Sequence, residues 1–146
     1  NSANNVSLKD INGIQLGSSL KTAPFAQPFN ISGTLNITAN GAITDLENLT
    51  VTGGTTLNAT GHNITLDSAN NNFSTVAANG KNVTLNDSNG IILGASTITG
   101  TLGVTAGGNI TNSGKLTVTG GTTTLEANGN DITLNNNANN FSTVVA

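Results

Sequence analysis

The sequence predicts an all-β protein, a right-handed parallel β-helix (β-solenoid) with about six to seven coils of roughly 19–27 residues each. Three observations lead to this fold class. Long stretches of the sequence occur twice, short segments alternate apolar with small polar residues, and turns rich in Gly and Asn separate these segments. Parallel strands joined by crossovers are overwhelmingly right-handed, which sets the expected hand.

The composition favours strands over helices. Asn, Thr, Gly and β-branched apolar residues are abundant, and Val, Ile and Thr suit strands whereas Gly and Asn suit turns. The same composition is typical of disordered, low-complexity chains. The apolar residues nevertheless recur in short groups at regular intervals, and this regularity argues against disorder.

The charge pattern excludes several classes of partner. The chain has four Lys and no Arg against seven acidic residues, a net charge of −3, and the Lys residues lie singly. Neutralising phosphates needs clustered basic residues, so we expect no nucleic-acid partner. With no basic amphipathic helix and no long apolar run, we expect no membrane insertion. The absence of Cys excludes disulfides and thiolate metal sites.

Two stretches of the chain carry almost the same thirteen residues. "NVSLKDINGIQLG" at 5–17 and "NVTLNDSNGIILG" at 82–94 are identical at nine positions. The match continues between 33–44 and 100–111, 49–56 and 116–123, 57–66 and 125–134, and 71–76 and 139–144. Such self-similarity indicates a repeat architecture.

The internal match predicts one β-helix segment over residues 1–146 that consists of two repeats of about 68 residues. The first repeat spans about 5–81 and contains about ten extra residues near 18–29, and the second spans about 82–146. The chain contains no Met, and no capping segment is evident, although solenoids need capped ends. We therefore expect a piece of a longer array, or a subunit that stacks end to end.

In each expected strand, two apolar residues flank one small or variable residue. This is the pattern of a strand with one buried face. The segments are 6–8, 14–16, 35–37, 49–51 and 64–66 in the first repeat, and 83–85, 91–93, 102–104, 116–118 and 132–134 in the second. The interior should consist of stacked Val, Leu and Ile with Phe73 and Phe141, and Thr and Asn should form outer ladders.

The spacing of equivalent apolar residues predicts the coils. Ile64, Ile91, Ile110 and Ile132 lie at intervals that indicate three coils per repeat. Adjacent coils lie about 4.8 Å apart, which favours the same residue in the same position of successive coils. We therefore expect Val6 and its repeat equivalent Val83 to occupy the same side of the interior.

The acidic residues do not form a catalytic pattern, so we expect no enzyme and no catalytic residue. Asp45 and Glu47 are the only close pair, and the second repeat replaces them by Asn and Gly, which favours a turn or solvated edge over a general acid–base pair. Asp10 and Asp87 occupy equivalent positions in the two repeats, which indicates that both are turn residues. The single His, His62, is replaced by Asn in the second repeat, which favours a surface turn.

No metal or cofactor motif is present, because the calcium-binding glycine-rich repeat and the EF-hand loop are both missing. The sequon N-x-[ST] occurs eleven times, largely because the phrase N-[IV]-[ST] leads from turns into strands, and glycosylation stays an open alternative. Thr-x-Thr pairs suggest an ice-binding face, but coils of unequal length disfavour it.

The insertion near 18–29 is the candidate partner-binding loop, with Lys21, Pro24, Phe25, Pro28 and Phe29 as its candidate contact residues. Pro removes donors from a strand ladder, so this segment should leave the coil, and loops on rigid scaffolds often carry recognition. The alternative, which we favour, is a loop that folds back and covers the flank or an end of the rod with its Phe rings.

The segments "LTVTGG", "AGGNITNSG", "NVTLNDSNGI" and "NNFSTV" resemble the repeat region of filamentous-haemagglutinin-like exoproteins, which bacteria export by two-partner secretion. The resemblance covers nearly the whole chain except 18–29. It implies a right-handed β-helix in a protein at the bacterial cell surface or outside the cell. It also implies that the parent protein binds a receptor or glycan on a host or neighbouring cell. The family's N-terminal secretion domain has no counterpart here.

The sequence therefore predicts a structural stalk or adhesin repeat, a rigid spacer that presents distal binding regions of a fibrous exoprotein. Two alternatives stay open: an extracellular filament subunit whose coils self-associate end to end, and a carbohydrate-binding β-helix module. A groove with carboxylates and aromatic rings would favour the carbohydrate module, and a flank of uniform Thr and Asn ladders would favour the stalk.

Overall fold

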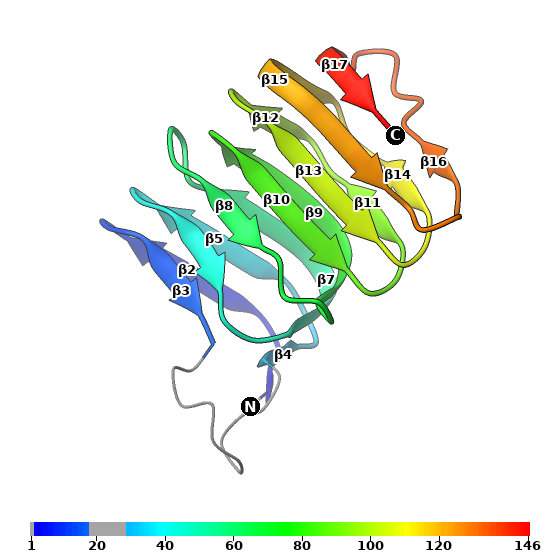
Figure 1. Ribbon diagram of the computed structural model, residues 1–146. Coiled ribbons are helices and arrows are strands. Elements are labelled where there is room, and N and C mark those ends of the chain that lie inside the picture. Colours follow the sequence, from blue (N-terminus) through cyan, green and yellow to red (C-terminus); the bar gives the residue numbers. More distant parts are fainter. Residues whose placement is uncertain (1, 18–28) are drawn as a thin grey trace.

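The computed structural model describes residues 2–17 and 29–146 and shows a stack of β-coils (Figure 1). Within these residues, seventeen strands form one sheet, every pairing between them is parallel, and no segment is helical. The first and last strands lie at opposite ends of the stack (Figure 1). The expected fold class, an all-β parallel solenoid of about six coils, is confirmed.

The strands form three columns along the rod, which we name A, B and C in chain order. Column A contains β2 (Val6–Asp10), β5 (Leu35–Ala39), the C-terminal parts of β7 (Leu49–Asn58) and β9 (Asn72–Gly80), β12 (Ser96–Ile98), and the N-terminal parts of β15 (Leu116–Glu126) and β17 (Asn140–Val145). Column B contains β3 (Ile14–Leu16), β6 (Ile43–Asp45), β8 (Ile64–Leu66), β10 (Val83–Asp87), β13 (Leu102–Ala106), and the C-terminal parts of β15 and β17. Column C contains β1 (Ser2–Ala3), β4 (Phe29–Ile31), the N-terminal parts of β7 and β9, β11 (Ile91–Leu93), β14 (Ile110–Asn112) and β16 (Ile132–Thr133). In this column, β11 pairs with the middle of β9.

The two repeats do not lie on the same faces of the rod. Val6 pairs with Leu35 in column A, whereas Val83 pairs with Ile64 and Leu102 in column B. The expectation that Val6 and Val83 share one side of the interior is therefore wrong. The same displacement holds for Ile14 in column B and its equivalent in column C, and for every other pair of equivalent strands.

The displacement follows from the number of strand positions in a repeat. β7 and β9 each pass through two columns, so β2 to β9 supply ten strand positions. Three positions complete a coil, and ten make three and a third coils rather than the expected three. The second repeat therefore starts one column further around the axis, and an apolar interior accepts this because Ile, Val and Leu replace one another at small cost.

The coil lengths also differ from those expected. Ile64 pairs with Val83, 19 residues further on, and not with Ile91. The shortest coil separates Val76 from Leu93 by 17 residues, and Val6 lies 29 residues before Leu35 because the insertion belongs to that coil.

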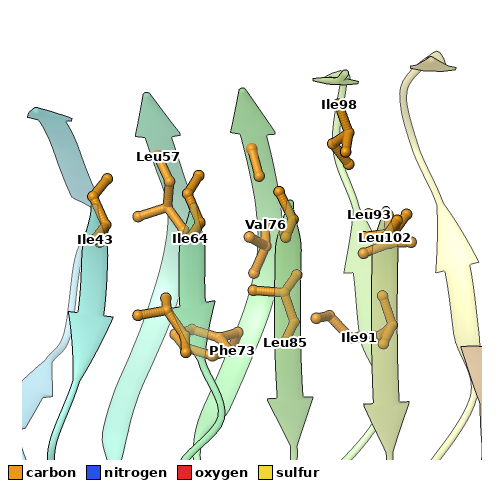
Figure 2. Packing of buried hydrophobic residues seen from close by; sticks show 14 of the residues in the cluster. Ile43, Leu57, Ile64, Phe73, Val76, Leu85, Ile91, Leu93, Ile98 and Leu102 are labelled. Carbon is orange, nitrogen blue, oxygen red and sulfur yellow. The ribbon is translucent and has the colours of Figure 1, made fainter. Parts of the chain in front are cut away.

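The core lies inside the three columns. In β5, burial alternates between buried Leu35 and Ile37 and exposed Asn36 and Thr38, as the period-2 pattern predicts. The side chains labelled in Figure 2 lie in the interior of the rod, and Phe73 is the largest of the fully buried ones. Phe141, its repeat equivalent, is only partly buried at the last coil.

The "TGG" motif of both repeats forms a tight corner inside β7 and β15. A Cβ atom on Gly53 would collide with the carbonyl oxygen of Gly33, and one on Gly120 with that of Thr99. Neither glycine has a positive φ, so close approach between the backbones of adjacent coils is what requires glycine here.

Among the described elements, none is a helix with the length and apolarity that crossing a bilayer requires.

Candidate functional site

The expected partner-binding loop falls largely on residues that the structure does not describe. Lys21, Pro24, Phe25 and Pro28 lie outside the described residues. Phe29 begins β4, donates its backbone N–H to the Asn48 carbonyl oxygen at 3.1 Å, and packs against the core. The ring of Phe29 therefore belongs to the rod and not to a projecting loop.

The carboxylate of Asp45 is buried at the end of β6, with 9% of the residue exposed, and does not lie at the solvated edge that we expected. One oxygen accepts from the Asp67 backbone N–H at 3.1 Å, and the other from the Ser68 N–H at 3.3 Å. The second oxygen also accepts from Asn71 Nδ2 at 2.6 Å. Asp45 thus accepts hydrogen bonds from backbone N–H groups of the next coil. Glu47 is partly buried beside it.

Asn71 has no exposed surface and joins two coils. Its Nδ2 donates to Asp45, and its Oδ1 accepts the Leu49 backbone N–H at 2.7 Å. The equivalent Asn139 accepts the Leu116 N–H at 2.9 Å. The "NNF" motif therefore supplies a side-chain acceptor where a strand begins, a role that sequence reasoning missed although the motif itself was visible.

Asp10 and Asp87 are turn residues, as predicted. Each accepts a hydrogen bond from the backbone N–H two residues on, at 2.6 Å from Asn12 and at 2.8 Å from Asn89. Asp87 is 4% exposed, and its other oxygen accepts the Phe73 N–H of the preceding coil at 2.7 Å. Desolvation by burial raises the pKa of Asp87 above its ordinary value, while the hydrogen bonds from Phe73 and Asn89 oppose this rise.

We predict that Asp87→Asn flattens the acid side of the stability profile. Because the folded-state pKa of Asp87 is raised above 3.8, its contribution to stability is fully present below that pH and is lost as pH rises through the folded-state pKa. Asn cannot titrate, so the variant lacks this part of the slope. Denaturant unfolding from pH 3.5 upwards measures it, with Asp10→Asn at the exposed turn as control. Equal slopes for the native chain and Asp87→Asn would contradict the prediction.

Asparagine side chains of the N-x-[ST] sequons form hydrogen bonds at the corners of the rod. Asn5 Oδ1 accepts the Thr34 backbone N–H at 2.9 Å, and Asn82 Oδ1 accepts that of Thr101 at 3.0 Å. Asn82 Nδ2 in turn donates to Asn63 Oδ1 at 3.2 Å, so an Asn ladder of the expected kind joins these two coils. These positions explain the frequency of the phrase N-[IV]-[ST], because the Asn before a strand bonds the next coil.

His62 lies exposed in a turn, as predicted, and its backbone N–H donates to the Ala59 carbonyl oxygen at 2.8 Å. In the part of the chain that the structure describes, no three His, Cys, Asp or Glu residues gather as a metal site.

The two ends of the rod expose strand edges. Within the described residues, β2 pairs only with β5, and β17 pairs only with β15. We name β2 and β3 the N-terminal edge, and β16 and β17 the C-terminal edge. Leu8 is 37% exposed at the N-terminal edge, whereas Val144 and Val145 are 47% and 53% exposed at the C-terminal edge.

The stacked coils and the side chains that tie them together define a solenoid repeat protein. The chain belongs to the family described as "Repeats of unknown function (DUF5649)", whose model matches residues 3–79 and again residues 80–146. Neither the comparison with curated proteins nor that with solved structures finds a match.

Proposed function

We propose that the chain is a non-enzymatic, stiff spacer in a fibrous protein of the bacterial surface or the extracellular space. The observation that carries this proposal is the parallel ladder, which continues from β2 to β17 through every described coil. Bending such a rod in any direction stretches the hydrogen bonds of at least one of its three columns, so stiffness follows from the architecture.

The buried polar side chains support a mechanical role. Asp45, Asn71 and Asp87 each accept at least one backbone N–H of a neighbouring coil, which strengthens the corners. A carbohydrate module would instead need aromatic rings and carboxylates in an open groove. Phe29, Phe73 and Phe141 all pack against the core, and this arrangement favours the spacer.

The resemblance to filamentous-haemagglutinin-like exoproteins supports the location and the adhesin context. In that setting the rod holds a distal region of the parent protein away from the cell, where that region contacts a receptor or glycan. Each coil is small and contacts only its neighbours, so the chain can fold coil by coil after export. The corner asparagines suit this order of folding, because each bonds an adjacent coil.

We predict that length grows linearly with repeat number. Each repeat supplies three and a third coils, and with coils about 4.8 Å apart it should add about 16 Å to the rod. Small-angle X-ray scattering of chains with two, four and six repeats measures the maximum dimension. Gly/Ser chains of equal length are the control, because their dimension grows with the square root of length. A maximum dimension that grows less than linearly would contradict the spacer role.

A further inference from the structure

We propose that Asn89, which precedes Gly90 at an exposed corner in the middle of the rod, is a site of spontaneous chemical modification. Water converts its side-chain amide into a carboxylate, and in part of the product the main chain runs through this side chain as isoaspartate. The inference does not depend on the spacer role, because the chemistry needs only this corner and water.

The reaction is an intramolecular attack, which proximity of the two groups favours. The backbone nitrogen of Gly90 loses its proton to hydroxide and attacks Cγ of Asn89, and the bond from Cγ to Nδ2 breaks. Nδ2 takes up a proton and leaves as ammonia, and a five-membered succinimide ring remains. Water then opens the ring. Breaking the bond between the ring nitrogen and Cγ gives aspartate, and breaking the bond to the main-chain carbonyl carbon gives isoaspartate, whose main chain is one carbon longer.

The side chain of Asn89 is free to reach the reactive geometry. Asn89 and Gly90 are both exposed, so water and hydroxide have access to them. Within the described residues, the backbone N–H of Asn89 donates to Asp87 Oδ1 at 2.8 Å, whereas its side-chain amide and the Gly90 N–H form no hydrogen bond. The reacting groups therefore have no bond to break before Cγ approaches the nitrogen.

Two glycines leave the attacking nitrogen unhindered. Gly90 itself has no Cβ next to its nitrogen. Gly108, in the next coil, lies beside the same nitrogen, and a Cβ on Gly108 would be 2.8 Å from it. Because both positions are glycine, no side chain of either residue blocks the approach of the Asn89 amide.

The chain contains five Asn–Gly pairs, and two of them provide restrained controls. Asn79 lies in β9, and its Oδ1 accepts a backbone N–H of the next coil at 3.1 Å. Asn128 donates its Nδ2 to a carbonyl oxygen of the preceding coil at 3.0 Å. Each of these amides must break its bond before it reacts, whereas that of Asn89 need not. The pairs at Asn12 and Asn40 lie in coils next to residues that the structure does not describe, and they do not enter the comparison.

Isoaspartate does not fit this corner. A Cβ on Gly90 would already lie 2.9 Å from the carbonyl oxygen of Asn109, which leaves no room for an added main-chain carbon. Two bonds between coils flank the pair. The Gly107 N–H donates to the Asp87 carbonyl oxygen at 3.0 Å, and the Ile91 N–H donates to that of Asn109 at 3.0 Å. A longer main chain between these bonds displaces at least one of them, so the modification weakens the contact between coils as the protein ages.

Ageing of the purified chain tests the proposal. After incubation at mildly alkaline pH, peptide mapping by mass spectrometry measures the conversion of each asparagine, and enzymatic methylation measures isoaspartate. Asn89 should react about fivefold or more faster than Asn79 and Asn128, because the bonds of the other two amides must break first. In the urea-denatured chain the three should react at similar rates, since each precedes Gly. The absence of a preference for Asn89 in the native chain, or the same preference in the denatured chain, would overturn the proposal.

Two variants separate the chemistry from its effect on the fold. Asn89→Gln keeps an amide but needs a larger ring for the same attack, so its unfolding midpoint in urea should stay constant during ageing while that of the native chain falls. Freshly purified Asn89→Asp carries the new charge without the added main-chain carbon and should unfold at the midpoint of the fresh native chain. An equal fall for the native chain and Asn89→Gln, or a midpoint of Asn89→Asp as low as that of the aged chain, would contradict the effect of isoaspartate.

Discussion

Phe73→Ala should lower the free energy of unfolding by about 3–5 kcal/mol, the cost of an empty aromatic site in a packed core. Phe73 is 2% exposed and is the largest fully buried side chain among the residues that the structure describes. Its ring lies in the interior beside the strands of neighbouring coils (Figure 2). In a thin core with one coil above and one below, the surrounding side chains cannot collapse into the cavity without tilting a coil.

The repeat provides an internal comparison for this change. Phe141 is only partly buried at the last coil, so Phe141→Ala should cost less than half as much. Denaturant unfolding followed by circular dichroism measures both losses. Since each coil contacts only its neighbours, the damage at Phe73 should also separate the rod into two unfolding transitions. Equal losses for the two variants would show that depth in the rod does not determine the cost.

Much of the fold could be predicted because its signals are local. Alternation such as Leu35–Ala39 marks strands with one buried side, and near-identical segments mark stacked units. The column of each strand could not be predicted in the same way. β7 and β15 each run through a "TGG" corner without a break in their strand character, so the number of corners per repeat is invisible in the sequence pattern.

Two buried threonines follow these corners. Thr55 and Thr123 are 2% and 0% exposed, although Thr was expected to face outward. In β15 the inward-facing phase changes at the corner, because Leu116 and Val118 are buried before it and Thr123 and Leu125 after it. In β7 the phase does not change, and Thr55 faces inward in step with Leu49 and Val51. Alternation read from the sequence does not reveal such a shift, because Thr fits either face of a strand.

The polar side chains of the candidate site were harder to predict for a different reason. Asp45 looked like a solvated turn residue because its repeat equivalent, Asn112, is uncharged. Its burial depends on donors that lie 22 to 26 residues away, in the next coil. Only the stacking of coils brings these groups together, and no local pattern records it.

Asn71→Leu should cost about 3 kcal/mol or more, because it leaves two buried groups without their partners. The Leu49 N–H loses its acceptor, and the buried Asp45 carboxylate loses its closest donor, at 2.6 Å. Leu has a similar size, so the loss reports hydrogen bonding rather than a cavity. Equilibrium unfolding in urea gives the free energies.

Two further variants separate the polar network from packing. Asn139→Leu makes the same change at the partly exposed equivalent, where water can replace the lost bonds, and should cost less than about 1.5 kcal/mol. Adding Asp45→Asn to Asn71→Leu removes the buried charge and should recover part of the loss, since an unpaired buried charge is more costly than an unpaired amide. If Asn71→Leu and Asn139→Leu cost the same, or if the second substitution recovers nothing, then packing at the corner and not the Asp45–Asn71 bond holds these coils together.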